Sequence, residues 1–542
     1  MVLIPLLALL AAAPSGVDAW RAHRVGLFVH WGVATGRALP QSHSHARQSG
    51  LNPSGSVPAA VYDEFYREFH PTAYDPDELL RLAHSAGMRY AVFVAKHHDG
   101  FSMYQSAANP YNVMATPYGK DVARQFAEAC RRQGLALGWQ LSPKDWKHPD
   151  FHTAAHDRYN AYYEKVVAEL ATQYGPLTTM WFDGTEPIEA AEWKGTPQRV
   201  ADYLHRVQPG IMLSNHGGGP EDFVSFEAMV GPFDRAQPWE MAEAINPSGW
   251  VFNKPMPAWP FRELLRNMVY TIARDGNYLL DVGPRQDGTL HPADAERLGE
   301  FAAWMKPNAE AVHGTRGGPY RDGDWGGATC KGRIVYLFVS DRVGGTLTVP
   351  ALGAKVRSVR RLDGGAVRFS RVGRGGWRFD LSGARAAFTV VRVELDREAF
   401  GLPVVDGQEN LATAGNTVAS SVRGGFPVGA MFDNLGDTAW DAEAGDAAPS
   451  LTVDLGTVRA VRGVSFSQRS QRLSWHQYYR YEVSVRDTAE GAWRSVYKGH
   501  SCLGGVPVLE LDGVRGRYVR VEIRKPRASL PVELAEFRVF GE

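Results

Sequence analysis

One pattern recurs between residues 26 and 290: an amphipathic segment, a glycine, an apolar run and a polar turn. In the clearest copy, Asp75 and Pro76 are the cap and first residue typical of a helix start, and Gly87 is typical of a helix end. The leucines and alanines between them fall on one helical face. This pattern predicts a helix followed by a buried strand.

Repetition of this unit predicts the fold of the first half of the chain. Further helices are expected to end at Gly134, Gly175, Gly210 and Gly276. The candidate strands are 26–32, 89–95, 135–142, 177–184, 211–215, 222–227, 249–253 and 277–284. Eight apolar strands that alternate with helices predict a (β/α)8 TIM-like barrel over residues 20–311. An open doubly wound sheet is the alternative, but the Gly-rich phosphate loop common in that fold does not follow the first strand.

The pattern changes after residue 311. Short alternating strands separated by turn residues predict a small β-sandwich over residues 312–400. A segment with Gly and Pro then leads to a second all-β unit, residues 404–542, in which Tyr518, Arg520 and Glu522 alternate along a late strand. The chain is therefore expected to be multidomain.

Charge and cysteine content narrow the classes of function. The 542 residues include 59 basic and 59 acidic side chains, so no overall field favours nucleic acid or an anionic membrane. Cys130, Cys330 and Cys502 lie far apart, which fits neither a disulfide framework nor a metal-binding motif. Residues 1–19 hold a short apolar run and then small residues, which predicts a signal peptide and a secreted or periplasmic protein, although a basic residue before the run is missing.

Polar and aromatic side chains follow the predicted barrel strands. The carboxyl ends of the strands meet at one mouth of a TIM barrel, where its chemistry takes place. The residues that fall there are His30, Trp31, Lys96, His97, His98, Asp99, Gln140, Ser142, Asp145, Trp146, Trp181, Asp183, Asn215, His216 and Glu227. We therefore expect these side chains to line one pocket for a polar ligand.

Several of these residues lie in motifs that resemble those of a known family. Residues 20–400 resemble the retaining α-L-fucosidases of glycoside hydrolase family 29, through GLFVHWG, AKHHDGF, LSPKDW, MWFDG and NYLLDVGP in that order. Residues 404–542 resemble a discoidin, or F5/8 type C, module of the carbohydrate-binding type, through NLATAGNTVASS and AMFDNLGDTAWDAEAG. The resemblance implies a TIM-like barrel, a small β-sandwich and a discoidin-like jelly roll.

The resemblance also assigns two carboxyl groups to a reaction. A retaining glycosidase needs a nucleophile and an acid/base about 5–5.5 Å apart. Asp183 in WFDG is expected to be the nucleophile, and an Asp that only caps the next turn is the alternative. For the acid/base we favour Glu227, at the end of a predicted strand, over Glu240, which lies in a Trp-Glu pair that recurs in the family. The family needs no cofactor for catalysis.

Histidines and tryptophans are the expected sugar contacts. The family uses equivalents of His30, His97 and His98 to hold fucose hydroxyls, and a neutral imidazole can both donate and accept hydrogen bonds. A zinc site competes with this interpretation, but adjacent strand residues face opposite sides, so one ion could bind both His97 and His98 only if the strand has ended. One of the three histidines could also be structural. Apolar walls, or ordinary core residues, are expected at Trp31, Trp146 and Trp181.

Three positions depart from the family pattern. Gln140 stands where many members have a Tyr that touches the sugar, Asn215-His216-Gly217 replaces a common Arg, and His45 stands where a Glu is expected. We keep Gln140 and His216 as candidate substrate contacts. These differences bear on single fucose contacts and on the preferred leaving group, and they leave the assignment of Asp183 unchanged.

The C-terminal module contains two candidate sites. Asp433, Asp437 and Glu536 supply oxygen ligands for a structural calcium ion that relatives hold in this loop, and a solvated Asx turn is the alternative. The second candidate is a cluster of aromatic side chains, which either stacks on a sugar or packs internally. It consists of Trp475, His476, Tyr478 and Tyr479.

The leading hypothesis is an exo-acting retaining α-L-fucosidase that acts on fucosylated glycans or oligosaccharides. Family analogy favours the 1,3/1,4-linked subtype. The alternatives are an α-L-galactosidase with the same mechanism and a catalytically silent carbohydrate-binding protein. Retention of Asp183 and of two candidate acids argues against the silent protein. Neither a nucleic-acid partner nor a membrane span is expected.

Overall fold

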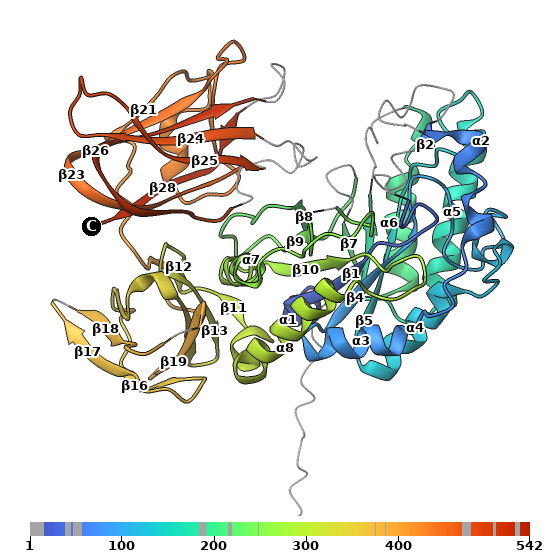
Figure 1. Ribbon diagram of the computed structural model, residues 1–542, viewed down its shortest axis with the longest axis horizontal. Coiled ribbons are helices and arrows are strands. Elements are labelled where there is room, and N and C mark those ends of the chain that lie inside the picture. Colours follow the sequence, from blue (N-terminus) through green and yellow to red (C-terminus); the bar gives the residue numbers. More distant parts are fainter. Residues whose placement is uncertain are drawn as a thin grey trace, which may run out of the picture.

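Three structural units make up the chain (Figure 1). The computed structural model describes residues 16–37, 45–46, 57–183, 191–214, 219–247, 249–373, 375–384, 386–468, 479–501, 506–525 and 532–542. In the view of Figure 1 a barrel lies at the right, a small β-domain at the lower left and the C-terminal β-domain above it. Within these ranges, every helix is too short or too polar to cross a membrane.

The barrel is a sheet of eight strands in which every paired neighbour runs parallel. Its strands are β1 (Val25–Val29), β4 (Tyr90–Lys96), β5 (Ala136–Leu141), β6 (Thr179–Phe182), β7 (Met212–Ser214), β8 (Val224–Glu227), β9 (Trp239–Ala244) and β10 (Asn277–Val282). The order is β7-β6-β5-β4-β1-β10-β9-β8, and the Asp222 N–H donates to the Leu213 carbonyl at 2.8 Å between the two end strands. The barrel is therefore nearly closed, and the predicted TIM-like fold is confirmed.

Six helices of eight or more residues accompany the barrel strands after the first: α3 (Pro76–Ser85), α4 (Val122–Gln133), α5 (His156–Gln173), α6 (Thr196–Val207), α7 (Phe261–Ala273) and α8 (Pro292–Val312). The Asp75 carboxylate accepts a hydrogen bond from the Glu78 N–H at 3.0 Å, so the expected cap of α3 is present. Helix α7 ends at Ala273, three residues before the predicted Gly276. There Asp275 takes the positive φ of 77°, and Gly276 is needed because the Trp239 ring lies 2.5 Å from the position of a Cβ.

The seventh barrel strand differs from the prediction. The run 249–253 was expected to form it, but the strand is β9, Trp239–Ala244. This segment carries two glutamates in six residues, Glu240 and Glu243, which hid it among the polar loops. Both glutamates are buried, because hydrogen bonds from neighbouring side chains replace the water that each loses.

The interior of the barrel holds its own apolar cluster, separate from the core between strands and helices. This cluster includes Phe28, Trp181, Phe223, Ala242 and Leu279. Side chains two residues apart on a strand share a face, so residues two or four positions further along these strands also point inward. By this rule, the residues that point inward at the mouth are His30, Asp183, Glu227 and Asp281. Glu240 also points inward, but it precedes Ala242 and lies nearer the opposite end.

A short helix closes that opposite end. Helix α1 (Gly16–His23) places Trp20, which is 1% exposed, against Phe223 at a ring distance of 4.5 Å. The first four residues of this helix, 16–19, belong to the expected signal peptide. Cleavage there would therefore remove the first half of α1.

Two β-rich units follow the barrel. The small β-domain pairs β11 (Arg316–Gly317), β13 (Gly326–Lys331), β14 (Ile334–Ser340), β19 (Phe388–Leu395) and β16 (Val356–Arg361) in one sheet, and β15 (Thr346–Val349), β18 (Gly376–Asp380) and β17 (Arg368–Val372) in another. In addition, β12 (Tyr320–Arg321) and β20 (Val405–Asp406) form a short parallel pair. This pair joins the start of the small β-domain to the segment that leads into the C-terminal domain. Between these sheets lies a core that includes Trp325, Trp377 and Phe379.

The C-terminal domain is antiparallel throughout. Its main sheet contains β21 (Thr417–Ala419), β23 (Ser450–Ser467), β26 (Leu509–Arg524), β24 (Tyr479–Arg486), β25 (Arg494–Ser501) and β28 (Glu536–Gly541), and β22 (Trp440–Asp441) pairs with β27 (Glu533–Leu534). Val519, Val521 and Ile523 are fully buried on one face of β26, whereas Arg520 and Glu522 point away from it. This alternation is the one that the sequence predicted.

Ion pairs join the three units. Arg262 on α7 contacts Asp341 of the small β-domain at 2.9 Å and Glu510 of the C-terminal domain at 3.1 Å. Arg462 of the C-terminal domain contacts Asp324 of the small β-domain at 2.9 Å. The C-terminal domain therefore packs against both of the other units.

Candidate active site

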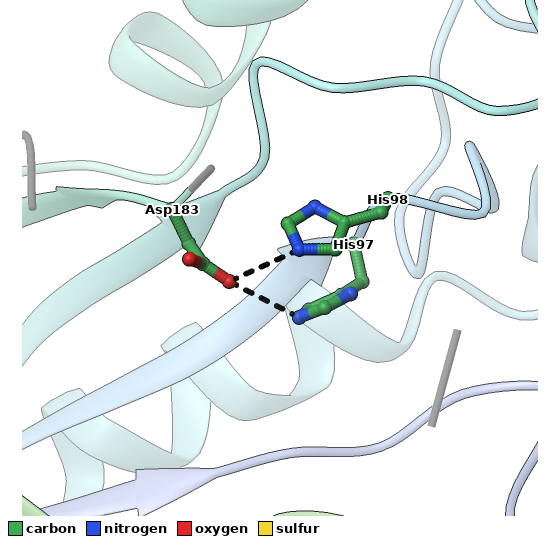
Figure 2. Close-up of side chains that lie close together, drawn as sticks. All are labelled: His97, His98 and Asp183. Carbon is green, nitrogen blue, oxygen red and sulfur yellow. Dashed lines mark ion pairs between the residues drawn. The ribbon is translucent and has the colours of Figure 1, made fainter. Parts of the chain in front are cut away.

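Three polar side chains converge on one carboxylate oxygen at the mouth of the barrel. Asp183 directly follows β6, and its Oδ2 lies 3.3 Å from His97 Nε2 and 3.5 Å from His98 Nε2 (Figure 2). Gln140, at the end of β5, donates from Nε2 to the same oxygen at 3.1 Å. All four residues are at most 8% exposed, so these contacts act with little screening by water.

Both histidines reach Asp183 because β4 ends at Lys96, one residue before them. The register of β4 against β5 also shifts between Val94 and Lys96. The strict alternation of a strand no longer applies beyond this point, and the two imidazole rings lie side by side with centroids 4.1 Å apart. The Lys96 ammonium pairs with Asp145 at 3.3 Å.

Hydrogen bonds to Ser142 orient His98. The His98 Nδ1 lies 2.5 Å from the Ser142 hydroxyl oxygen, which also accepts the Lys144 N–H at 3.0 Å. A hydroxyl that already accepts an N–H is well placed to donate its own proton to Nδ1. In that arrangement the His98 Nε2 carries the ring proton and directs it toward Asp183.

His30 lies beside the His97–His98–Asp183 group, and its ring contacts the carboxyl group of Asp281 on the neighbouring strand β10. Its Nδ1 is 2.6 Å from Asp281 Oδ1, and the two residues are 3% and 1% exposed. Burial lowers the pKa of His30 well below its usual value, and the nearby His97 lowers it further. Burial raises the pKa of Asp281 well above its usual value, with a further contribution from Asp294. The His30 ring is therefore neutral at pH 7.

Glu227 and Glu240 occupy different levels of the barrel. Glu227 is the last residue of β8, at the mouth, and is 8% exposed. Glu240 is the second residue of β9 and is fully buried, with hydrogen bonds from the Tyr90 hydroxyl and, at 2.9 Å, from Trp181 Nε1. Burial raises the Glu240 pKa to about 7. Glu227 thus shares the mouth with Asp183, whereas Glu240 lies among the side chains below it.

The three predicted tryptophans differ in their surroundings. Trp31 packs against Phe69 and Tyr74 at ring distances of 5.3 and 4.9 Å. Trp181 lies in the barrel interior beneath Asp183 and is fully buried. Trp146 lies next to the sugar-site candidates, with its ring 6.0 Å from that of His98. Trp146 is therefore the one of the three whose ring lies beside that of His98.

Sequence analysis missed two side chains at the site. Trp250 lies with its ring 5.2 Å from that of His30, but it belonged to a run interpreted as a strand. Asp281 was read as an ordinary member of the last strand. The alternation of β10, with Leu279 in the barrel interior, is the signal that would have found it. A small cavity beside the histidines is lined by His30, Trp31, Thr35, Val94, His97 and Asp99, among others.

Two clusters in the described chain bring three potential metal ligands together. The first is His97, His98 and Asp183, with ligand atoms within 4.8 Å of one another. The second is His152, His156 and Glu192. In the second cluster, His156 Nδ1 already accepts the His152 N–H at 3.0 Å, which leaves its proton on Nε2 and no lone pair for an ion. Only the first cluster has its nitrogens directed at a shared carboxylate oxygen.

The remaining predicted sites lie in the C-terminal domain or outside the described residues. The Asp433 carboxylate accepts hydrogen bonds from the Leu435 N–H at 2.9 Å and from the Thr438 hydroxyl, which is the geometry of an Asx turn. Among the residues with described positions, Asp433, Asp437 and Glu536 do not form a cluster of ligand atoms within 4.8 Å. Tyr479 is fully buried. Outside the described residues lie Asn215, His216, Gly217, Trp475, His476, Tyr478 and Cys502.

Family models match two parts of the chain. A model described as Alpha-L-fucosidase matches residues 12–310, and one described as F5/8 type C domain matches residues 416–534. The tissue alpha-L-fucosidase of Rattus norvegicus is 26% identical over 324 residues, which cover 55% of this chain and 69% of the relative. The plasma alpha-L-fucosidase of Homo sapiens is 24% identical over 318 residues, or 54% of this chain and 68% of the relative.

Solved structures match over longer stretches. Alpha-L-fucosidase isoenzyme 1 from Paenibacillus thiaminolyticus superposes with a TM-score of 0.62 at 27% identity, over 70% of this chain and 99% of that one. An alpha-L-fucosidase from Vibrio sp. strain EJY3 superposes with a TM-score of 0.67 at 21% identity, over 97% of this chain and 98% of that one. The second likeness concerns the fold, and it extends over all three domains.

Proposed function

This chain belongs to the alpha-L-fucosidase family of glycoside hydrolases, family 29, and we propose that it releases terminal α-L-fucose with retention of anomeric configuration. The observation that carries the proposal is the carboxylate of Asp183, at the carboxyl end of a barrel strand, with Gln140, His97 and His98 gathered on one of its oxygens. Such a buried, oriented carboxylate suits attack on an anomeric carbon.

Asp183 acts as the nucleophile in this proposal. Three nitrogens around Oδ2 stabilise a negative charge on this group, which is only 7% exposed. They also fix the direction of the carboxylate, which reduces the reorganisation needed on the way to the transition state.

Glu227 acts as the acid/base. Its position at the last residue of β8, on an inward-facing register with Ser225 and Phe223, supports this role over Glu240. Glu240 has both oxygens engaged by Tyr90 and Trp181 in the interior and lies lower in the barrel. We assign Glu240 a structural role, in which it ties β4, β6 and β9 together.

The two steps follow from these assignments. The Asp183 carboxylate bonds to the anomeric carbon as the bond to the glycosidic oxygen breaks, and Glu227 gives its proton to that oxygen. Then Glu227, now ionised, takes a proton from water. The water oxygen bonds to the anomeric carbon and displaces Asp183, which restores the original configuration. Neither step requires a metal ion or a cofactor.

His30, His97 and His98 bind the sugar in this proposal, with Trp146 as an apolar wall. The neutral His30 and the hydrogen-bonded His98 each direct a defined ring nitrogen, as hydroxyl recognition requires. Natural substrates are fucosylated glycans or oligosaccharides of the 1,3/1,4-linked type, which the C-terminal F5/8 type C domain helps to bind. We further propose that the protein is secreted or periplasmic.

Hydrolysis of aryl glycosides followed by proton NMR tests the proposal. We expect cleavage of an aryl α-L-fucoside with the α-anomer of fucose released first, and cleavage of 1,3- and 1,4-linked oligosaccharides. Faster cleavage of the aryl α-L-galactoside would change the substrate assignment but leave the mechanism. First release of the β-anomer would exclude double displacement, and no cleavage of either aryl glycoside would exclude the activity.

A further inference from the structure

His30 and Asp281 form a buried pair that links two neighbouring strands. His30 directly follows β1 and Asp281 lies in β10, and these strands pair in parallel with Phe28 opposite Asp281. The His30 N–H also donates to the Val282 carbonyl at 3.2 Å, so the backbone of His30 is fixed to the same strand. The carboxyl group therefore meets the imidazole from the wall of the barrel.

The contact defines which ring nitrogen can face the substrate. Nδ1 lies 2.6 Å from Asp281 Oδ1, a strong hydrogen-bond distance. Nε2 lies on the other side of an imidazole ring from Nδ1. The ring neighbours of His30 include His97 at 6.0 Å and Trp250 at 5.2 Å, both after the carboxyl ends of strands. With Nδ1 engaged at the wall, Nε2 is left for the pocket.

Burial makes this contact rigid. Both side chains are at most 4% exposed, so a broken pair would leave two polar groups without water. A free imidazole can turn by 180° about its bond to Cβ at little cost in a polar pocket, but this one would lose its hydrogen bond by doing so. The carboxyl group thereby selects one ring orientation, with Nδ1 toward β10.

We propose that Asp281 is a positioning residue for substrate binding: it holds Nδ1 of His30 so that Nε2 contacts a hydroxyl of the bound sugar. This inference rests on the proposed function, because it takes the sugar to be α-L-fucose. It adds a residue that acts through another side chain and does not itself touch the substrate. Loss of the Asp281 carboxyl group should therefore weaken binding of the sugar in the ground state, and this loss should depend entirely on the presence of His30.

Asp281→Asn is the test variant, and Glu243→Gln is its matched control. Glu243 is also a buried carboxyl group, on the adjacent strand β9, with hydrogen bonds from Tyr278 at 2.6 Å and Asn267 at 2.9 Å. It lies on the face of β9 opposite Glu240 and the barrel interior. We expect Asp281→Asn to raise KM for the aryl fucoside and Kd for free L-fucose by about tenfold, with kcat changed less than threefold. The control should change neither constant.

A double-mutant cycle with His30→Gln decides whether the effect passes through the imidazole. We expect Asp281→Asn to have no further effect on L-fucose affinity when His30 is already replaced. Equal losses in both backgrounds, or a tenfold loss in the Glu243→Gln control, would overturn the positioning role.

Ring 15N NMR of the unmodified protein gives a second measurement, in case Asp281→Asn does not fold. The His30 signals are those missing from His30→Gln, and L-fucose should shift the Nε2 signal much more than the Nδ1 signal. A larger shift at Nδ1 would contradict the inference. If the unmodified protein neither hydrolyses α-L-fucosides nor binds L-fucose, the proposed function fails. If it binds fucose without a response at His30, only the positioning role fails.

Discussion

Asp183 and Glu227 stand at the same mouth of the barrel, but different parts of the molecule support them. The described contacts of Asp183 come from within the barrel, from Gln140 near the end of β5 and from His97 and His98 after β4. The residue after Glu227, Ala228, has a positive φ of 54° and donates to the Ala242 carbonyl at 2.8 Å. From there the chain enters a loop, residues 228–238, that other domains contact.

That loop is held by a chain of charged residues through all three domains. Arg274 donates to the Gly231 carbonyl at 3.1 Å and pairs with Asp322 of the small β-domain at 2.8 Å. Arg538 of the C-terminal domain donates to the Asp322 carbonyl at 2.9 Å. In addition, Gly436 of the C-terminal domain packs closely against Pro232 of the loop: a Cβ added to this glycine would lie 2.9 Å from the proline ring. The described contacts of the proposed nucleophile thus come from the barrel, whereas the loop that follows the proposed acid/base is held by all three domains.

Replacing the nucleophile should give the largest effect. We expect Asp183→Ala to lower kcat for an aryl α-L-fucoside by at least about 10⁴-fold, because no other group forms the covalent intermediate. Added azide, a small nucleophile, should restore part of the rate. Asp157→Ala, at an exposed carboxylate on α5 that pairs with Lys194, is the control and should retain full activity. Near-normal activity in Asp183→Ala would exclude the mechanism.

The next largest effect should distinguish the two candidate acid/base residues, Glu227 and Glu240. We expect Glu227→Gln to lower kcat/KM for oligosaccharides by about 10²–10⁴-fold, because the leaving oxygen is no longer protonated. Aryl fucosides with acidic leaving groups should lose less, since they need little protonation. Glu240→Gln should retain most activity on both substrate types. The opposite result, with Glu240→Gln inactive on oligosaccharides and Glu227→Gln active, would reverse the assignment.

The same comparison explains what the sequence could predict. Asp183 follows an apolar strand that ends in a specific motif, so both its place and its neighbours from β4 and β5 were predictable from local pattern and barrel geometry. For Glu227 the place was predictable, but its support was not. Arg274, Asp322 and Arg538 lie up to 264 residues apart in the numbering of the chain, and nothing in the local pattern of one reports the other two.

Strand β9 illustrates a second limit. Its glutamates at 240 and 243 have the composition of a loop, and their burial depends on hydroxyl, indole and amide groups from other elements. A pattern of apolar residues predicts which apolar side chains are buried by the hydrophobic effect. It does not predict polar side chains whose burial is possible because hydrogen bonds replace their contacts with water. The run at 249–253 has no charged residue, so the pattern of apolar positions favours it over β9.

Disturbing the support of the Glu227 loop should have a smaller effect than removing either carboxyl group. We expect Asp322→Asn to lower kcat by about 10- to 100-fold, because Arg274 loses a charged partner and Gly231 is less firmly held. The Km for aryl fucosides should change little, since Asp183 and the histidines stay in place. Asp454→Asn is the control: it removes a similar two-contact pair, with Arg517 at 2.8 Å, within the C-terminal domain.

Measurements at a temperature well below unfolding separate a shifted loop from a loss of fold. Thermal unfolding of Asp322→Asn should begin at a lower temperature, because a buried pair has lost one charge. If kcat of folded Asp322→Asn equals that of the control, the Glu227 loop does not depend on the other domains. Asp183 and Glu227 would then differ in the contacts around them but not in how far their activity depends on the other domains.

The smallest effect concerns stability and not activity. Burial raises the Glu240 pKa from 4.5 to about 7, so the folded protein keeps this proton to a higher pH than the unfolded chain does. The contribution of Glu240 to stability is therefore fully present below pH 4.5 and is lost as the pH rises to about 7, by about 3 kcal/mol at most. Because Gln does not titrate, we expect the unfolding temperature of Glu240→Gln to fall less steeply over this range. Glu243→Gln provides the comparison, since burial raises that pKa to about 7 as well. Parallel curves for the unmodified protein and Glu240→Gln would mean that the pKa of Glu240 is the same in the folded and unfolded chains, and that its burial does not favour the protonated form.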